Sequence, residues 1–189
     1  MTFADLLAEV IAQLHRTGIP FMVTGSLASS FHGEPRATRD LDVVIDPTSA
    51  ALTGLVRELM EAGFHVDEPA ARAALADRTQ FNAIGPEATK VDFIIRRERP
   101  FSIAEFERRE PADLLGTPGY VATAEDLVIA KLEWAEATDS DRQRRDVLGI
   151  VTVAEDLDRD YIDRWAAALG LEDAWQSILD EASAGPQVS

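Results

Sequence analysis

Two stretches of this chain decide its fold: FMVTGSLASS, residues 21–30, and RATRDLDVVI, residues 36–45. The first begins with a short apolar run and passes through a Gly-Ser pair into a segment of small residues. The second ends in an apolar run that begins beside two aspartates, Asp40 and Asp42. Alternate side chains of a strand project from one face, so the two carboxylates point the same way, roughly 7 Å apart along the backbone. The pattern predicts a strand that turns into a helix, followed by a strand that carries an acidic pair.

A third carboxylate, Asp92, begins another β-like run, VDFII at residues 91–95. Carboxylates held this close repel one another unless a cation lies between them. Mg²⁺ prefers oxygen ligands and usually takes one or two carboxylates together with phosphate oxygens. A third carboxylate on a neighbouring strand would allow two ions about 3.5–4 Å apart. We therefore predict that Asp40, Asp42 and Asp92 are metal ligands and catalytic residues; the alternative for Asp92 is an ordinary carboxylate at the start of a strand.

The Gly-Ser pair, Gly25 and Ser26, has the chemistry of a phosphate site. Glycine allows the backbone to approach a ligand closely. A turn from a strand into a helix directs free N–H groups and the positive end of the helix dipole at an anion. A serine hydroxyl can add one more donor. We predict that Gly25 and Ser26 bind a triphosphate and that Arg39, in the basic run before the acidic pair, assists; the alternative for the arginines is a solvated face.

The composition narrows the classes of function. The chain has 189 residues and a formal net charge of −16, and it contains no cysteine. The length suits one sizeable domain, or one domain with a helical extension. The acidic balance weighs against binding to extended duplex DNA. No apolar run is long enough to span a bilayer, so no membrane association is expected. The lack of cysteine excludes disulfides and thiolate metal sites and fits a cytoplasmic location.

Periodicity in the sequence predicts a mixed α/β (α+β) fold, with a small mixed sheet flanked by helices and a helical C-terminal region. Apolar residues at helical spacing begin near Phe3, and from Ala124 onward all the periodicity is helical. We expect an α/β core over 1–121, a helical region over 122–184 and a tail over 185–189. The expected strands are 19–23, 39–45, 64–66, 79–84 and 90–95, and a helix is expected over 27–31.

These residues resemble a known group of proteins. A Gly-Ser pair, an Asp-x-Asp motif about a dozen residues later and a further strand aspartate are typical of the nucleotidyltransferase superfamily, whose fold is shared by DNA polymerase β and kanamycin nucleotidyltransferase. The run from Gly25 through His32 to Asp42 is most similar to small prokaryotic nucleotidyltransferases that include AbiEii-type toxins of toxin–antitoxin systems. In that group a later helix opens with Glu-Asp-Leu and carries a lysine, as in EDLVIAKL at residues 125–132, and an Arg-Asp pair follows.

The resemblance implies roles for individual residues. Gly25 and Ser26 would hold the triphosphate, and Lys131 would reach its phosphates. Asp92 would serve as a metal ligand and general base, and Asp146 would orient Lys131 or a nearby arginine. From the residues alone, Lys131 could equally extend from an apolar helix face toward solvent, and Asp146 could be a structural ion-pair partner.

The sequence thus predicts an enzyme, a Mg²⁺-dependent and nucleotide-binding (ATP-type) nucleotidyltransferase, with two Mg²⁺ ions and an NTP as co-substrate. It would transfer a nucleoside monophosphate to an acceptor hydroxyl and release pyrophosphate. The toxin-like interpretation predicts an RNA end or a protein side chain as acceptor and an antitoxin as partner. One alternative is an aminoglycoside-type small-molecule enzyme, since an acidic surface suits a cationic substrate. Another is a catalytically idle nucleotide- or partner-binding module of the same fold.

Overall fold

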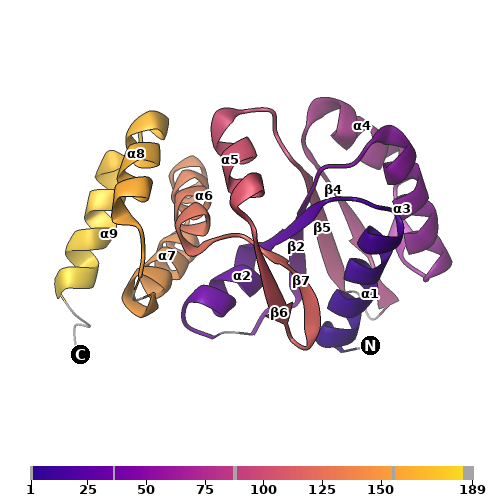
Figure 1. Cartoon of the computed structure of the whole chain (residues 1–189), viewed down its shortest axis with the longest axis horizontal. Coiled ribbons are helices and arrows are strands. Elements are labelled where there is room, and N and C mark those ends of the chain that lie inside the picture. The colour runs from indigo at the N-terminus through magenta and orange to yellow at the C-terminus, as the bar shows by residue number, and fades with distance from the viewer. Residues whose placement is uncertain (1, 36, 87–88, 155, 185–189) are drawn as a thin grey trace. The chain divides into compact units, whose positions relative to one another are not determined.

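A computed structural model describes residues 2–35, 37–86, 89–154 and 156–184 of the chain (Figure 1). The chain divides into two compact units. The first contains the described residues up to Leu27 and from Ala37 to Ala122. The second contains those from Ala28 to Pro35 and from Thr123 onward. The division falls within one helix, α2 (Gly25–His32), so the segment after the Gly-Ser pair groups with the C-terminal helices.

The first unit is built on a mixed sheet of seven strands, in the order β3-β4-β5-β2-β1-β7-β6. The pairs β2–β5 and β1–β7 are parallel, and the other neighbours are antiparallel. The central strands are fully buried on one face, where Leu41, Val91 and Phe93 are inaccessible to solvent. The strands are β1 (Phe21–Thr24), β2 (Asp40–Ile45), β3 (His65–Val66), β4 (Gln80–Ile84), β5 (Lys90–Ile95), β6 (Glu110–Leu114) and β7 (Thr117–Val121).

Helices cover this sheet because each has one apolar stripe. The first helix begins at a capping box, in which the Thr2 hydroxyl accepts from the Asp5 N–H and the Asp5 carboxylate accepts from the Thr2 N–H. It packs against α3 and β7, and α3 in turn packs against α4 and β3. The helices of this unit besides the start of α2 are α1 (Phe3–Arg16), α3 (Ser49–Glu61), α4 (Glu68–Asp77) and α5 (Pro100–Arg108).

The second unit is a bundle of four helices together with the end of α2. Helix α6 packs against α7, α8 and α9, and α9 also packs against α7 and α8. At its centre the Asp126 carboxylate, inaccessible to solvent, accepts from the hydroxyls of Thr123 and Tyr161 at 2.7 and 2.6 Å. These bonds satisfy a buried charge that would otherwise be costly. The helices are α6 (Ala124–Thr138), α7 (Asp141–Val153), α8 (Arg159–Leu169) and α9 (Glu172–Ala184).

The predicted fold class is confirmed, and several elements differ in detail from the sequence-based expectations. The helix expected over 27–31 begins two residues earlier, at Gly25. The Ala-rich segment after β3 forms α4, and the stretch 100–121, for which no element was predicted, forms α5 and the β6–β7 hairpin. The tail predicted over 185–189 lies outside the described residues. Within the described residues, no helix combines the length and apolar character needed to cross a membrane.

Candidate functional site

The acidic residues of β2 and β5 lie side by side at one edge of the sheet. The two strands are parallel, and their register places Asp42 opposite Asp92 and Asp40 opposite Lys90. On the other side of β2, Asp42 is opposite Thr24, the last residue of β1. Asp42 and Asp92 are partly buried, whereas Asp40 is exposed at the strand's first position. Because partners in a sheet project from the same face, the structure brings the predicted carboxylates of two strands, far apart in sequence, onto one surface.

The backbone of Gly25 packs closely against the Asp42 carboxylate. A Cβ atom built on Gly25 would lie 1.9 Å from Asp42 Oδ2, far inside contact distance. The backbone there has φ = 64°, in the left-handed region that glycine adopts readily. Two independent demands, space and backbone conformation, therefore require glycine at this position. The predicted pairing of a Gly-Ser turn with the acidic motif thus has a direct geometric basis.

The two oxygens of the Asp92 carboxylate differ in their hydrogen bonding. Asp92 Oδ2 accepts a hydrogen bond from Lys90 Nζ at 2.8 Å. Asp92 Oδ1 is buried and has no hydrogen-bond partner among the described residues. A buried acceptor left in this way costs free energy. The site therefore holds a covered carboxylate oxygen that has no hydrogen-bond partner among the described residues.

Lys90 is a member of the site that sequence reasoning missed. The hydrogen bond from Lys90 to Asp92 raises the pKa of the Lys90 ammonium, against the effect of partial burial, and the charges of Asp92, Asp40 and Asp42 raise it further. The signal was present in the sequence: Lys90 lies two residues before Asp92 in a predicted strand, so the two side chains had to share a face.

The carboxylates match the ligand chemistry of Mg²⁺. They offer hard oxygen donors, including Asp92 Oδ1, which has no hydrogen-bond partner among the described residues. Mg²⁺ commonly needs only one or two carboxylates plus phosphate oxygens. In the part of the chain that the structure describes, no three His, Asp or Glu side chains are gathered into a ready metal-binding group. The residues thus fit a divalent cation that arrives with phosphate ligands. The two-ion arrangement stays a prediction.

The other residues predicted to contact phosphate differ in burial and in the unit to which they belong. Ser26 is buried, 8% exposed, in the first turn of α2, directly after Gly25. Arg39 is exposed and directly precedes β2. Lys131 belongs to the second unit, on α6, and is only 5% exposed. The acidic site and the Gly-Ser pair therefore belong to the first unit, whereas Lys131 belongs to the second.

Lys131 is the centre of a buried polar group in the second unit. Its Nζ donates to Asp146 Oδ2 at 2.7 Å and to Gln143 Oε1 at 2.8 Å, both on α7. The side chains of Lys131 and Asp146 are 6% and 7% exposed. The ammonium is thus held inside the bundle instead of extending toward solvent. The pairing of Lys131 with Asp146 agrees with the contact expected from the resemblance, while the role of Lys131 in phosphate binding stays a prediction.

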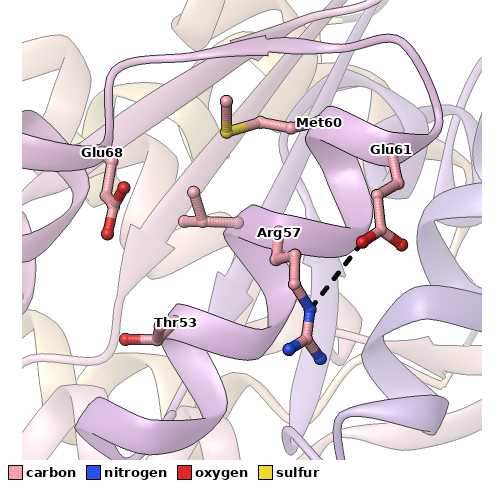
Figure 2. A pocket seen from close by; sticks show the side chains of 6 residues that line it. Thr53, Arg57, Met60, Glu61 and Glu68 are labelled. Atoms are coloured by element: carbon pink, nitrogen blue, oxygen red, sulfur yellow. Dashed lines mark ion pairs between the residues drawn. The ribbon is translucent and has the colours of Figure 1, made fainter.

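Two cavities lie elsewhere in the two units. A hollow of about 370 Å³ in the first unit lies between α3 and α4, where Figure 2 shows the Arg57–Glu61 ion pair, 3.9 Å long, at its rim. None of the predicted site residues lines it. A second, of about 310 Å³, lies in the second unit and includes Asp146 beside Arg142 and Arg145. The acidic residues themselves lie at the beginnings of two neighbouring central strands, β2 and β5.

The arrangement of elements is similar to that of solved nucleotidyltransferases. A crystal structure of ANT(2")-Ia in complex with adenylyl-2"-tobramycin gives a TM-score of 0.64 at 15% identity, and the match covers 89% of this chain and 97% of that one. The lincosamide antibiotic adenylyltransferase LnuA, in a lincomycin-bound crystal structure, gives 0.56 at 10% identity, with 82% and 99% covered. The chain has the nucleotidyltransferase fold.

A nucleotidyltransferase-like protein from Paracoccidioides brasiliensis shares this fold as well, with a TM-score of 0.51, 18% identity and 78% and 73% of the two chains covered. Comparison of the sequence with protein-family models and with curated proteins finds no match. At such identities the likeness concerns the nucleotidyltransferase fold alone. The finer resemblance to AbiEii-type toxins stays a prediction.

Proposed function

We propose that this protein is a Mg²⁺-dependent nucleotidyltransferase that transfers a nucleoside monophosphate from an NTP to an acceptor hydroxyl and releases pyrophosphate. The observation that carries the proposal is the register of β2 and β5, which sets Asp42 opposite Asp92, with the backbone of Gly25 packed against the Asp42 carboxylate. The nucleotidyltransferase fold supports it. Such an acidic edge is costly in a protein that binds no cation.

In this proposal Asp40, Asp42 and Asp92 hold the metal, and Gly25 and Ser26 hold the triphosphate at the start of α2. When bound, Mg²⁺ would neutralise the phosphate charge and polarise the reacting oxygens. The free N–H groups of the first helical turn favour the phosphates electrostatically. Positioning and charge stabilisation are the main catalytic contributions in phosphoryl-type transfer.

The chemical step in this proposal uses the unpartnered oxygen of Asp92, Oδ1. The acceptor hydroxyl oxygen attacks the α-phosphorus, and its proton passes to Asp92 Oδ1. The bond from the α-phosphorus to the bridging oxygen breaks, and pyrophosphate leaves with the electron pair. Asp92 Oδ2, bonded to Lys90 at 2.8 Å, keeps the carboxylate oriented during the step.

For the acceptor, we propose a cationic small molecule of the aminoglycoside type. ANT(2")-Ia and LnuA, which share the fold over most of their length, are both described with small antibiotic molecules. The net charge of −16 would favour the approach of a cationic substrate. An RNA end or a protein side chain, as in the toxin-like interpretation, is the competing acceptor class.

A labelling experiment tests both parts of this proposal. Purified protein would be incubated with Mg²⁺ and each α-labelled NTP, together with tobramycin, lincomycin, tRNA or a protein mixture. We expect label on a small molecule and stoichiometric pyrophosphate, both abolished by Asp42→Asn. The matched control Asp77→Asn removes an exposed carboxylate of α4 in the same unit and should leave the signal unchanged. Label on RNA or protein would favour the toxin-like interpretation, and NTP binding with no label on any acceptor would favour the idle module.

A further inference from the structure

Lys90 occupies the position where a cation would be expected in the acidic site. It begins β5, opposite Asp40 of β2, and its Nζ lies 2.8 Å from Asp92 Oδ2. The Lys90 side chain is 38% exposed and that of Asp92 is 13% exposed. The ammonium therefore reaches in from the accessible edge of the sheet toward a carboxylate that is largely covered. An ion pair of this kind can be broken from the solvent side without unfolding the strand.

The charge of Lys90 interacts with the whole acidic cluster. Lys90 Nζ contacts Asp92 Oδ2 at 2.8 Å, and Lys90 lies opposite Asp40 in the register of β5 and β2. A lysine ammonium is a cation across the physiological pH range. One ammonium in the field of three carboxylates relieves part of their mutual repulsion.

Lys90 also determines which oxygen of Asp92 is engaged. It binds Oδ2, while Oδ1 is buried without a hydrogen-bond partner among the described residues. A carboxylate fixed by one oxygen loses rotational freedom, so the other oxygen is presented in a defined direction. Lys90 therefore has two effects on the same site: it orients Asp92, and it adds positive charge where a metal would bind.

We propose that Lys90 is a positioning residue and built-in counter-ion of the acidic site, which orients Asp92 through Oδ2 and competes with the divalent cation for the carboxylates. This inference rests on the proposed function, because it assumes that the carboxylates bind a metal. It predicts that the site binds free metal more weakly than the same site would without the Lys90 charge. A metal that arrives with a triphosphate gains extra ligands and overcomes the competition, whereas the metal alone binds more weakly.

The inference predicts opposite effects on metal affinity and on turnover. Lys90→Met removes the charge at nearly constant chain length, and should tighten binding of free Mn²⁺ roughly tenfold, allowing for solvent screening. The same variant should lower kcat roughly tenfold or more, because Asp92 is no longer oriented. The KM for the metal–NTP complex should stay the same or fall. A residue with a merely structural role would weaken metal binding when replaced.

The test is a titration of the full-length protein with Mn²⁺ alone, in which the EPR signal of free Mn²⁺ gives the bound fraction. Lys90→Arg keeps the positive charge and a hydrogen-bond donor, so this variant should retain the Mn²⁺ affinity and turnover of the wild type. Arg57→Met is the matched control, since it removes one positive charge from an exposed side chain of the same unit, and should not change the affinity. If thermal melting shows that Lys90→Met fails to fold, the Mn²⁺ titration is repeated with Lys90→Gln.

The outcomes separate this inference from the proposed function. Tighter Mn²⁺ binding in Lys90→Met with slower turnover, reversed in Lys90→Arg, supports the inference. Unchanged or weaker binding in the charge-removing variants, with binding still lost in Asp42→Asn, overturns the role of Lys90 and leaves the metal site intact. No binding of Mn²⁺ alone by the wild type or by any Lys90 variant overturns the role of Lys90, and the proposed function is then decided separately by binding of the Mg²⁺–NTP complex.

Discussion

The two ends of strands β2 and β5 carry opposite arrangements of charge. At their beginnings, one ammonium, that of Lys90, lies in the field of three carboxylates. At their ends, one carboxylate accepts from two guanidinium groups: Asp46 binds Arg78 at 3.2 Å and Arg96 at 2.9 Å. The strands are parallel, so each set lies at one edge of the sheet.

This difference supports our proposal that the Asp46 edge serves stability and the acidic edge serves function. At the Asp46 edge the charges are matched, and Arg78 also pairs with Glu98 at 2.6 Å and donates to the Arg96 carbonyl at 3.2 Å. Such a network ties α4 to the strands. At the acidic edge the negative charges are in excess over the paired ammonium, which destabilises the folded chain. An arrangement that costs stability in the free protein is expected where a substrate brings the compensating charge.

The largest expected effect is on turnover, from a substitution at the acidic edge. Asp42→Asn should lower nucleotidyl transfer by about 10³-fold, because a metal ligand is lost. The melting temperature should stay the same or rise, since repulsion is relieved. Steady-state pyrophosphate release and thermal melting measure the two quantities. A variant that keeps wild-type turnover, or that melts well below the wild type, would reverse the assignment of function to this edge.

A second pair of variants separates close packing from backbone strain. Gly25→Ala should reduce turnover by about 10²-fold, because the new Cβ displaces the Asp42 carboxylate. Gly18→Ala is the matched control: Gly18 has φ = 65°, close to the 64° of Gly25, but no atom lies within 4 Å of its Cβ position. Both should lose about 1–2 kcal/mol of stability from the left-handed backbone. Equal turnover in the two variants would contradict the contact between Gly25 and Asp42.

At the balanced edge the expected effect is on stability alone. Asp46→Ala leaves two partly buried guanidinium groups without their shared acceptor and should cost about 2 kcal/mol. For a chain of this size that is a fall of about 4–8 °C in melting temperature. Turnover at 25 °C should match that of the wild type. Loss of turnover in a variant that remains folded would mean that the Asp46 edge also takes part in function.

The smallest effect concerns an exposed carboxylate far in sequence from either edge, Asp5 in the capping box of α1. Hydrogen bonds from Thr2 hold the pKa of Asp5 below its ordinary value of 3.8. A lowered folded pKa means that this contribution is present above about pH 4 and is lost as the pH falls through the folded pKa. The melting temperature of Asp5→Ala should therefore be slightly lower than that of the wild type at pH 7. Melting curves at pH 7 and below pH 3 should show that gap closing; a gap that persists in acid would argue against the cap.

Local signals in the sequence predicted much of the fold. Strand β5 begins and ends where predicted, at Lys90 and Ile95, because a Gly-Pro pair precedes a run rich in β-branched and aromatic residues. Helix α8 likewise ends at a local signal, a glycine in the left-handed conformation, Gly170. The segment 100–121 carried no such signal. Its β6–β7 hairpin includes prolines and a glycine within the strands, so pairing with β1 decides its structure.

The candidate site was predicted as a set of residues but not as an arrangement. Spacing within β2 places Asp40 and Asp42 on one face, but nothing local fixes the register that sets Asp42 opposite Asp92. That register comes from the burial of Leu41, Val43 and their neighbours on the opposite face. Lys90 was not among the predicted site residues because charged residues at strand starts are common, although its spacing from Asp92 within one strand places both side chains on one face.

The most direct test of the account is a calorimetric titration of each NTP into the purified protein, with and without Mg²⁺. It would be repeated on the double variant Asp40→Ala/Asp42→Ala. We predict Mg²⁺-dependent binding of at least one NTP to the wild type and loss of that binding in the double variant. Binding that is unchanged by the double substitution, or no binding to the wild type under any condition, would contradict the assignment of this acidic edge as a metal–nucleotide site.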